Sequence, residues 1–401
     1  MAEGARMVDD QQRPLVSVVK QGGSIHTFLG FPAWMGVVGL LALMLLSVLM
    51  RLVDLKDPPL DFHETRQLGS AIIARGMYYQ SNDAADPELR KLAVDLWQEA
   101  PVYEPPILER IVATVYQLMG GEVLWVVRLI NAIFWLLGGL GIYLIARRFN
   151  PCGGSIVSAG FFLLTPFAIL ASRSFQPDPL MVVMSIYACL ALLRWTEKKS
   201  WGRAVLAGLL AGAAILIKAV AVFPVAGAFA GLLLVNEGLR RVWRQSQVWL
   251  MGLLAIAPTL IYHFLFIPER AEGLFGFWFS SFRDLVMKPS FYMGWAQQIN
   301  RVVGLEVFGL AIVGILSIRS RRGSGLWIGA LVGYAAYALA LPYQIMTHDY
   351  YHLMILIFVS IGLGAVFDAI CSRLVQREAL FRSSLAGPGC CVQRPALGSA
   401  G

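Results

Sequence analysis

The ten residues Pro58-Pro59-Leu60-Asp61-Phe62-His63-Glu64-Thr65-Arg66-Gln67 separate two very different parts of the chain. One long apolar run precedes them and roughly nine more follow. Asp61, His63, Glu64 and Arg66 lie close together here, whereas the apolar runs are almost free of charge. An acid, a base and a cation at the end of a membrane span indicate that chemistry takes place at the membrane surface.

The composition is that of a membrane protein. Of 401 residues, 57% are apolar and only 14% are charged, and apolar runs of about 17 to 25 residues are typical of helices that cross a bilayer. In a soluble protein the net charge of +8 would suggest a nucleic-acid partner. Here the charge is spread over loops, so we expect no nucleic acid. The five cysteines lack the spacing of a zinc site or a disulfide framework.

The sequence therefore predicts an all-α polytopic membrane protein with about ten transmembrane helices. The expected spans are Trp34–Leu52, Val123–Ala146, Ser155–Ala171, Leu180–Leu193, Ala204–Ile217, Ala219–Val235, Val248–Ile267, Val302–Ile318, Gly325–Leu341 and Tyr350–Ile370. We expect a cytoplasmic N-terminal segment over 1–27, a transmembrane domain over 28–378 and a disordered cytoplasmic tail over 379–401.

Lysine and arginine gather in alternate connections between the spans. Examples are Arg147-Arg148, Arg240-Arg241 and Arg321-Arg322, and the N-terminal segment is basic too. The positive-inside rule places these segments in the cytoplasm. Both termini are then expected inside, and Asp61 outside.

The long first outer loop, residues 53–122, is expected to carry two amphipathic helices at the membrane surface. Asp86-Pro87-Glu88 supplies an N-cap, a proline at the first helical position and an acid in the first turn. Apolar residues then recur at helical spacing. A second amphipathic pattern follows Glu104-Pro105-Pro106 and stops at Gly120-Gly121.

Other ionisable residues also fall in connections that we place outside. Arg173 and Asp178 join the third and fourth spans, Lys218 separates the fifth from the sixth, and His348-Asp349-Tyr350-Tyr351-His352 opens the last span. Such residues at membrane depth indicate function. Arg173 and Lys218 have a second interpretation, since long basic side chains at span ends can extend to lipid headgroups.

A divalent metal is an alternative for the histidines and carboxylates. His63, His348 and His352 with Asp61, Asp178 and Asp349 would supply enough ligands. However, the chain has no HExxH motif, and these groups are scattered over three loops. Imidazoles that are packed or hydrogen-bonded are the favoured interpretation, so we expect no metal and no required cofactor.

The order of several motifs resembles the GT-C membrane glycosyltransferases. The most similar branch is the protein O-mannosyltransferase-like family, which includes the lipid A aminoarabinose transferases. The matching stretches are Asp61–Tyr79, Tyr103-Glu104-Pro105-Pro106, Val127-Arg128-Leu129-Ile130-Asn131, Arg147-Arg148-Phe149, Ser172–Asp178, Leu206–Lys218 and His348-Asp349-Tyr350-Tyr351. The family usually has an adjacent Asp-Glu pair, whereas Asp61 and Glu64 stand three residues apart here.

The resemblance implies that the donor is a sugar linked to polyprenyl phosphate, held among the membrane lipids. It also implies an acceptor on the outer face and inversion at the anomeric carbon. The acceptor could be a protein, a lipid or a glycan. We also expect a prokaryotic plasma membrane as the location.

The expected site residues fall into three groups. The catalytic candidates are Asp61, Glu64 and His63, with Asp61 as the base that a hydroxyl nucleophile needs. The cations suited to the donor phosphate are Arg66, Arg173 and Lys218. The substrate-binding candidates are Asp178, Glu104, His348, Asp349 and Tyr350.

Thr65 is expected to cap a helix whose first turn contains Arg66 and Gln67, and Glu64 would then be a favourable charge beside the start of that helix. His63 would either orient the carboxylate or bind phosphate.

A lipid or solute transporter or flippase is the rival function. A transporter would favour charges at the membrane midplane, broken helices and two similar halves. The expected spans have no midplane charges, and the chain shows no clear internal repeat.

Overall fold

The computed structural model describes residues 33–101, 104–150, 152–266 and 282–385, and within these ranges the chain is helical with no strand. The elements in chain order are α1 (Ala33–Leu52), α2 (Glu64–Gln80), α3 (Pro87–Glu99), α4 (Ile107–Met119), α5 (Val126–Ala146), α6 (Cys152–Leu164), α7 (Pro166–Ala171), α8 (Asp178–Glu197), α9 (Trp201–Ile217), η1 (Ala219–Ala221), α10 (Val222–Glu237), α11 (Leu239–Val242), α12 (Ser246–Ile261), η2 (Tyr262–Phe266), η3 (Arg283–Met287), α14 (Pro289–Val302), α15 (Leu305–Leu316), α16 (Arg321–Ala340), α17 (Pro342–Thr347), η4 (Asp349–His352) and α18 (Ile355–Leu385).

Among the described residues, seven helices are long and apolar enough to cross a membrane. The number is eight if α14 and α15, which meet at an angle of 87°, count as one span. Helices α6 and α9 are apolar but shorter. The all-α polytopic membrane fold is therefore confirmed, while the count of about ten spans stays a prediction.

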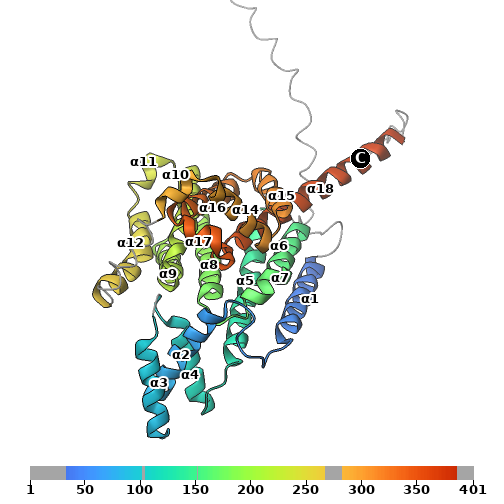
Figure 1. Cartoon of the computed structure of the whole chain (residues 1–401). Coiled ribbons are helices and arrows are strands. Elements are labelled where there is room, and N and C mark those ends of the chain that lie inside the picture. Colours follow the sequence, from blue (N-terminus) through green and yellow to red (C-terminus); the bar gives the residue numbers. More distant parts are fainter. Residues whose placement is uncertain (1–32, 102–103, 151, 267–281, 386–401) are drawn as a thin grey trace, which may run out of the picture.

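Helices α2, α3 and α4 form a layer of their own at one end of the bundle, away from α11 at the other end (Figure 1). The layer has a separate hydrophobic core around Met77, Val112 and Tyr116. Both amphipathic helices predicted for the first outer loop are present. The Asp86 side chain caps α3 by accepting from the Leu89 amide at 2.9 Å, and α4 ends at Gly120.

Close helix packing brings α10 against α16. A Cβ at Gly231 would meet the backbone oxygen of Gly325, and one at Gly329 would meet that of Gly227. Small residues let two membrane helices approach closely enough for extensive van der Waals contact. The glycines of α9 serve the same purpose against α12: a Cβ at Gly208 would lie 2.9 Å from Leu254 Cβ.

Three expected boundaries were wrong. The third span is interrupted at Thr165, where Pro166 begins α7 and holds the residue before it in an extended conformation. The predicted span Val302–Ile318 starts before the bend between α14 and α15, where Gly304 has a φ of 84°. The predicted tail begins within α18, which continues to Leu385; residues 386–401 lie outside the described residues, as does the segment 1–27.

An open groove of about 430 Å³ lies where the α6–α7 break faces the α14–α15 bend. Its walls are mainly apolar, with Phe161, Leu164 and Phe167 on one side and Val302 and Val303 on the other. The ring of Phe167 also packs against Phe62, with centroids 5.6 Å apart. The groove therefore borders the turn that precedes α2.

Candidate active site

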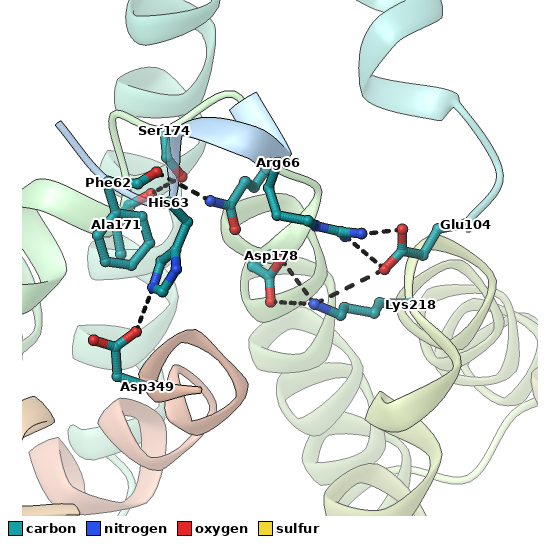
Figure 2. Close-up of polar contacts among 10 residues, drawn as sticks. Phe62, His63, Arg66, Glu104, Ala171, Ser174, Asp178, Lys218 and Asp349 are labelled. Atoms are coloured by element: carbon teal, nitrogen blue, oxygen red, sulfur yellow. Dashed lines mark hydrogen bonds and ion pairs between the residues drawn. The ribbon is translucent and has the colours of Figure 1, made fainter. Parts of the chain in front are cut away.

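Side chains from five separate parts of the chain meet at the boundary between the α2–α4 layer and the bundle. The turn before α2, the segment before α4, the start of α8, the α9–η1 junction and η4 all contribute polar groups (Figure 2). Three groups of contacts result: a first network around Lys218, a second network around Asp61, and a histidine–carboxylate pair.

The first network contains two cations and two carboxylates. Arg66 donates to both oxygens of Glu104 at 2.8 and 2.9 Å. Lys218 donates to both oxygens of Asp178 at 2.7 and 3.0 Å and lies 4.0 Å from Glu104 (Figure 2). The formal charges cancel, so Arg66, Glu104, Asp178 and Lys218 form one balanced ionic unit.

Burial differs strongly within this first network. The Lys218 side chain is 2% exposed and that of Asp178 is 3% exposed, whereas Arg66 is 22% exposed. The Lys218 ammonium also lies over the rings of Tyr350 and Tyr351, 4.8 and 4.4 Å from their centroids. Arg66 is thus the cation of this network that an incoming ligand can reach.

Electrostatics keep Arg66 charged. Burial acts most strongly and against the charge, but the Glu104 and Asp178 carboxylates together with the hydroxyls of Tyr350 and Tyr351 outweigh it and raise the pKa of Arg66 above its usual value. Burial also raises the pKa of Tyr350 to about 12, so its hydroxyl stays protonated at neutral pH.

The second network holds Asp61. Its Oδ1 accepts from Gln67 Nε2 at 3.2 Å, and its Oδ2 lies 3.4 Å from Arg128 Nη2. Arg173 belongs to the same region, because it donates to the Asp54 carbonyl that Arg128 also binds. The Asp61 side chain is 32% exposed, so its carboxylate oxygens remain accessible to a ligand.

The two arginines of the second network are buried. Arg128 and Arg173 are 3% and 6% exposed, and the carboxylates of Asp61, Asp54 and Asp57 all favour the charged form of Arg173. Burial, followed by the neighbouring Arg128, lowers the pKa of Arg173. Within the described residues the Nε of Arg173 has no hydrogen-bond partner.

The third group is a pair formed by His63 and Asp349. The two atoms His63 Nε2 and Asp349 Oδ1 are 2.6 Å apart, although they come from opposite ends of the chain. His63 is the N-cap of α2 and has left-handed backbone angles of φ 50° and ψ 64°. Such a conformation costs a non-glycine residue about 1–3 kcal/mol and is concentrated at functional sites.

The remaining predicted residues lie around these groups. His348 Nδ1 is 2.6 Å from Thr347 Oγ1, and its ring packs against Tyr350. Glu64 is exposed in the first turn of α2 and makes no hydrogen bond or ion pair with the described part of the chain.

Three expectations for individual side chains need correction. Helix α2 begins at Glu64 without a side-chain cap, so Thr65 does not cap it. Neither Lys218 nor Arg173 extends to lipid headgroups, because both are buried. The tight turn before α2 places His63 at the cap position instead, and the ion pair with Asp178 draws Lys218 inward.

The histidines considered as metal ligands do not converge. His63 contacts Asp349, whereas His352 is fully buried, with Tyr334 Oη 2.6 Å from its Nδ1 and the Ile345 carbonyl 2.8 Å from its Nε2. In the ranges that the structure describes, no group of three His, Cys, Asp or Glu side chains is arranged to hold a metal.

Sequence reasoning missed three residues that shape the site. Arg128 was considered only as part of a family motif, although a lone arginine at the start of an apolar span is a recognisable signal for a buried ion pair. Gln67 binds Asp61, the Phe62 carbonyl and the Phe175 amide at once. Glu109 is buried in α4, where desolvation raises its pKa despite a hydrogen bond from Ser70.

Comparisons with known proteins agree with this architecture. Residues 103–263 match the family model described as "Dolichyl-phosphate-mannose-protein mannosyltransferase". The crystal structure of ArnT from Cupriavidus metallidurans bound to undecaprenyl phosphate is similar with a TM-score of 0.56 and 17% identity, over 89% of this chain and 64% of that chain. The chain has the GT-C fold.

A second GT-C structure gives the same result. The archaeal oligosaccharyltransferase AglB from Archaeoglobus fulgidus, in complex with an inhibitory peptide and a dolichol-phosphate, is similar with a TM-score of 0.55 and 14% identity. The match covers 87% of this chain and 52% of that one. The chain thus spans less than two thirds of the length of either structure. No curated protein matches it in sequence.

The family resemblance predicted from the sequence is therefore confirmed. The matched region 103–263 contains Glu104, Arg128, Asp178 and Lys218. It does not contain Asp61, His63 or Asp349, so the family match does not bear on these three predicted site residues.

Proposed function

We propose that the protein is a membrane glycosyltransferase that moves a sugar from a polyprenyl-phosphate donor to an acceptor on the outer face, with inversion. The observation that carries the proposal is the meeting of five separate connections in one cluster of charged groups at one end of a GT-C bundle. Ionisable groups at such positions are costly to bury and mark substrate sites.

Arg66 is the residue to which we assign the donor phosphate. Its guanidinium is the accessible cation of the first network, and it presents several donors in a planar fork suited to phosphate. Lys218 is less suited to direct contact, because Asp178 and the two tyrosine rings enclose it. The apolar groove beside Phe167 offers the lipid chain a surface near the site.

Asp61 is the residue to which we assign the proton of the attacking hydroxyl. Arg128 and Gln67 hold its carboxylate in a defined orientation while leaving it accessible, which suits a positioned general base. Inversion then follows from a single displacement with no covalent intermediate. A monophosphate leaving group does not require a metal, so the proposal includes no cofactor.

The orientation in the membrane is also part of the proposal. The basic connection at Arg240-Arg241 lies in α11, at the end of the bundle opposite to the α2–α4 layer (Figure 1). The positive-inside rule then favours cytoplasmic termini and an outward-facing site, in a prokaryotic plasma membrane.

Identification of the co-purified lipid tests the proposal even while the sugar is unidentified. Mass spectrometry of the purified full chain should find polyprenyl phosphate or its sugar conjugate, and Arg66→Ala should reduce its amount by about tenfold or more. Arg90→Ala is the matched control, because Arg90 forms an ion pair with the exposed Asp83 outside the site. A wild-type preparation without any polyprenyl phosphate would argue against the proposed donor.

A transporter or flippase, the rival function, predicts a different result in vesicles. A flippase would move an intact fluorescent polyprenyl phosphate across the bilayer of reconstituted vesicles, whereas a transferase would not. Movement that depends on Arg66 would favour the rival.

A further inference from the structure

The His63–Asp349 pair is a third polar group that neither the donor cation nor the base assignment uses. We propose that His63, held by Asp349, donates a proton to the donor phosphate as it leaves. This inference rests on the proposed glycosyl transfer and adds a general acid to it.

The geometry fixes which nitrogen of His63 could act. Nε2 donates to Asp349 Oδ1 at 2.6 Å. The imidazole ring is held between Phe62 and Tyr350, each with a ring centroid 4.7 Å away and nearly perpendicular. Nδ1 has no hydrogen-bond partner in the described part of the chain, and the His63 side chain is 31% exposed. Nδ1 is therefore the nitrogen available to a ligand.

The surroundings place His63 on the phosphate side of the site. Its ring contacts Tyr350, and the Lys218 ammonium of the first network lies over the same tyrosine ring. Asp61 contacts Arg128 of the second network instead. An in-line displacement needs the base and the leaving group on opposite sides of the anomeric carbon, and the proposal assigns Asp61 to one side and His63 to the other.

The charged and titratable groups near His63 come from several elements. The Asp349 carboxylate accepts the hydrogen bond from His63, and this bond lowers the pKa of Asp349 against the effect of burial. His348 interacts electrostatically with His63, and the Lys218 ammonium lies over the Tyr350 ring that His63 contacts. A bound anionic phosphate would be a second negative partner for the imidazole.

The proposed step balances. The acceptor oxygen forms a bond to the anomeric carbon and gives its proton to Asp61, while the bond from that carbon to the phosphate oxygen breaks. The electron pair stays on the phosphate oxygen, which receives the proton from His63 Nδ1. The products are the glycosylated acceptor and the polyprenyl hydrogen phosphate, and His63 is left neutral until solvent returns a proton.

Binding of undecaprenyl phosphate alone tests the role of His63, because this probe represents the leaving group and does not depend on the sugar. We would measure its affinity for the reconstituted full chain at pH 6 and pH 8, for the wild type and for His63→Gln. Protonated His63 should strengthen binding at pH 6, and the advantage should vanish as rising pH removes the proton. The ratio of wild-type to variant affinity should therefore fall by roughly tenfold between the two pH values.

Comparing the two proteins at each pH cancels the titration of the lipid phosphate itself. His263→Gln is the matched control, because His263 lies in η2 and contacts only the Thr259 carbonyl and the Tyr262 ring among the described residues. Asp349→Asn should lose the pH 6 advantage as His63→Gln does. Equal pH dependence in wild type and His63→Gln would overturn the inference, whereas absence of binding by the wild type would overturn the proposed donor itself.

Discussion

The two ionic networks of the site differ in burial and in access to solvent. The first pairs two cations with two carboxylates, and its central Lys218–Asp178 contact is almost fully buried. In the second, the buried Arg128 lies 3.4 Å from the carboxylate of Asp61, whose side chain is one-third exposed. Both networks use residues of the segment 61–67 and residues from distant parts of the chain.

A buried and balanced network indicates a structural role. Charges removed from water are tolerated only when each is paired and hydrogen-bonded, and the resulting pair is costly to break. An exposed carboxylate held by a buried arginine is still open to substrate. The first network therefore shapes the site and offers Arg66 at its edge, whereas the second holds the group that reacts.

The largest expected effect comes from breaking the first network at its centre. Lys218→Gln leaves Asp178 buried without its ammonium partner, and we expect a loss of about 3–5 kcal/mol in the free energy of unfolding. Thermal unfolding of the purified protein in detergent would measure the change as a lowered Tm.

The double variant Lys218→Gln/Asp178→Asn separates lost charge balance from lost packing. Removing both charges together should recover much of the stability, since no unpaired buried charge remains. A single variant as stable as the wild type would mean that the first network is not structural.

The second network predicts a loss of rate without a loss of stability. Asp61→Asn keeps the shape and one hydrogen-bond acceptor for Gln67 but removes the base, so turnover should fall by about 100-fold or more. The Tm should stay near that of the wild type. Asp95→Asn is a suitable control, because Asp95 is an exposed carboxylate of α3 that forms no ion pair with the described residues. Near-normal turnover in Asp61→Asn would mean that the second network does not hold the catalytic base.

Features that depend on neighbouring residues could be predicted from the sequence. The N-cap at Asp86 and the stop of α4 at Gly120 rest on contacts within a few residues, and both are present. The break at Thr165 could also have been predicted from Pro166, since a proline keeps the residue before it out of the helix. The span prediction treated this stretch as one apolar run and overlooked that effect.

Pairings across the chain could not be predicted in this way. The sequence brings Arg66, Arg173 and Lys218 together as phosphate candidates because all three are cations beside outer span ends. Their partners depend on helix packing, which separates Arg173 from the other two. The contact of His63 with Asp349 likewise depends on the packing of η4 near the turn before α2, since 286 positions separate the two residues in the sequence.

The smallest expected effect comes from Glu64, which belongs to neither network. Glu64 lies one residue after His63 and is the first residue of α2, where a negative charge interacts favourably with the helix dipole. That interaction is worth about 0.3–1 kcal/mol at an exposed position, so Glu64→Gln should lower stability only slightly. Turnover should change by less than about threefold, because Glu64 has no polar contact to either network within the described chain.

Parallel rate measurements on Glu64→Gln and Asp61→Asn decide which of these two carboxylates, three residues apart, is the catalytic base. A dead Glu64→Gln beside an active Asp61→Asn would move the base to the exposed start of α2 and leave Asp61 as a partner of Arg128.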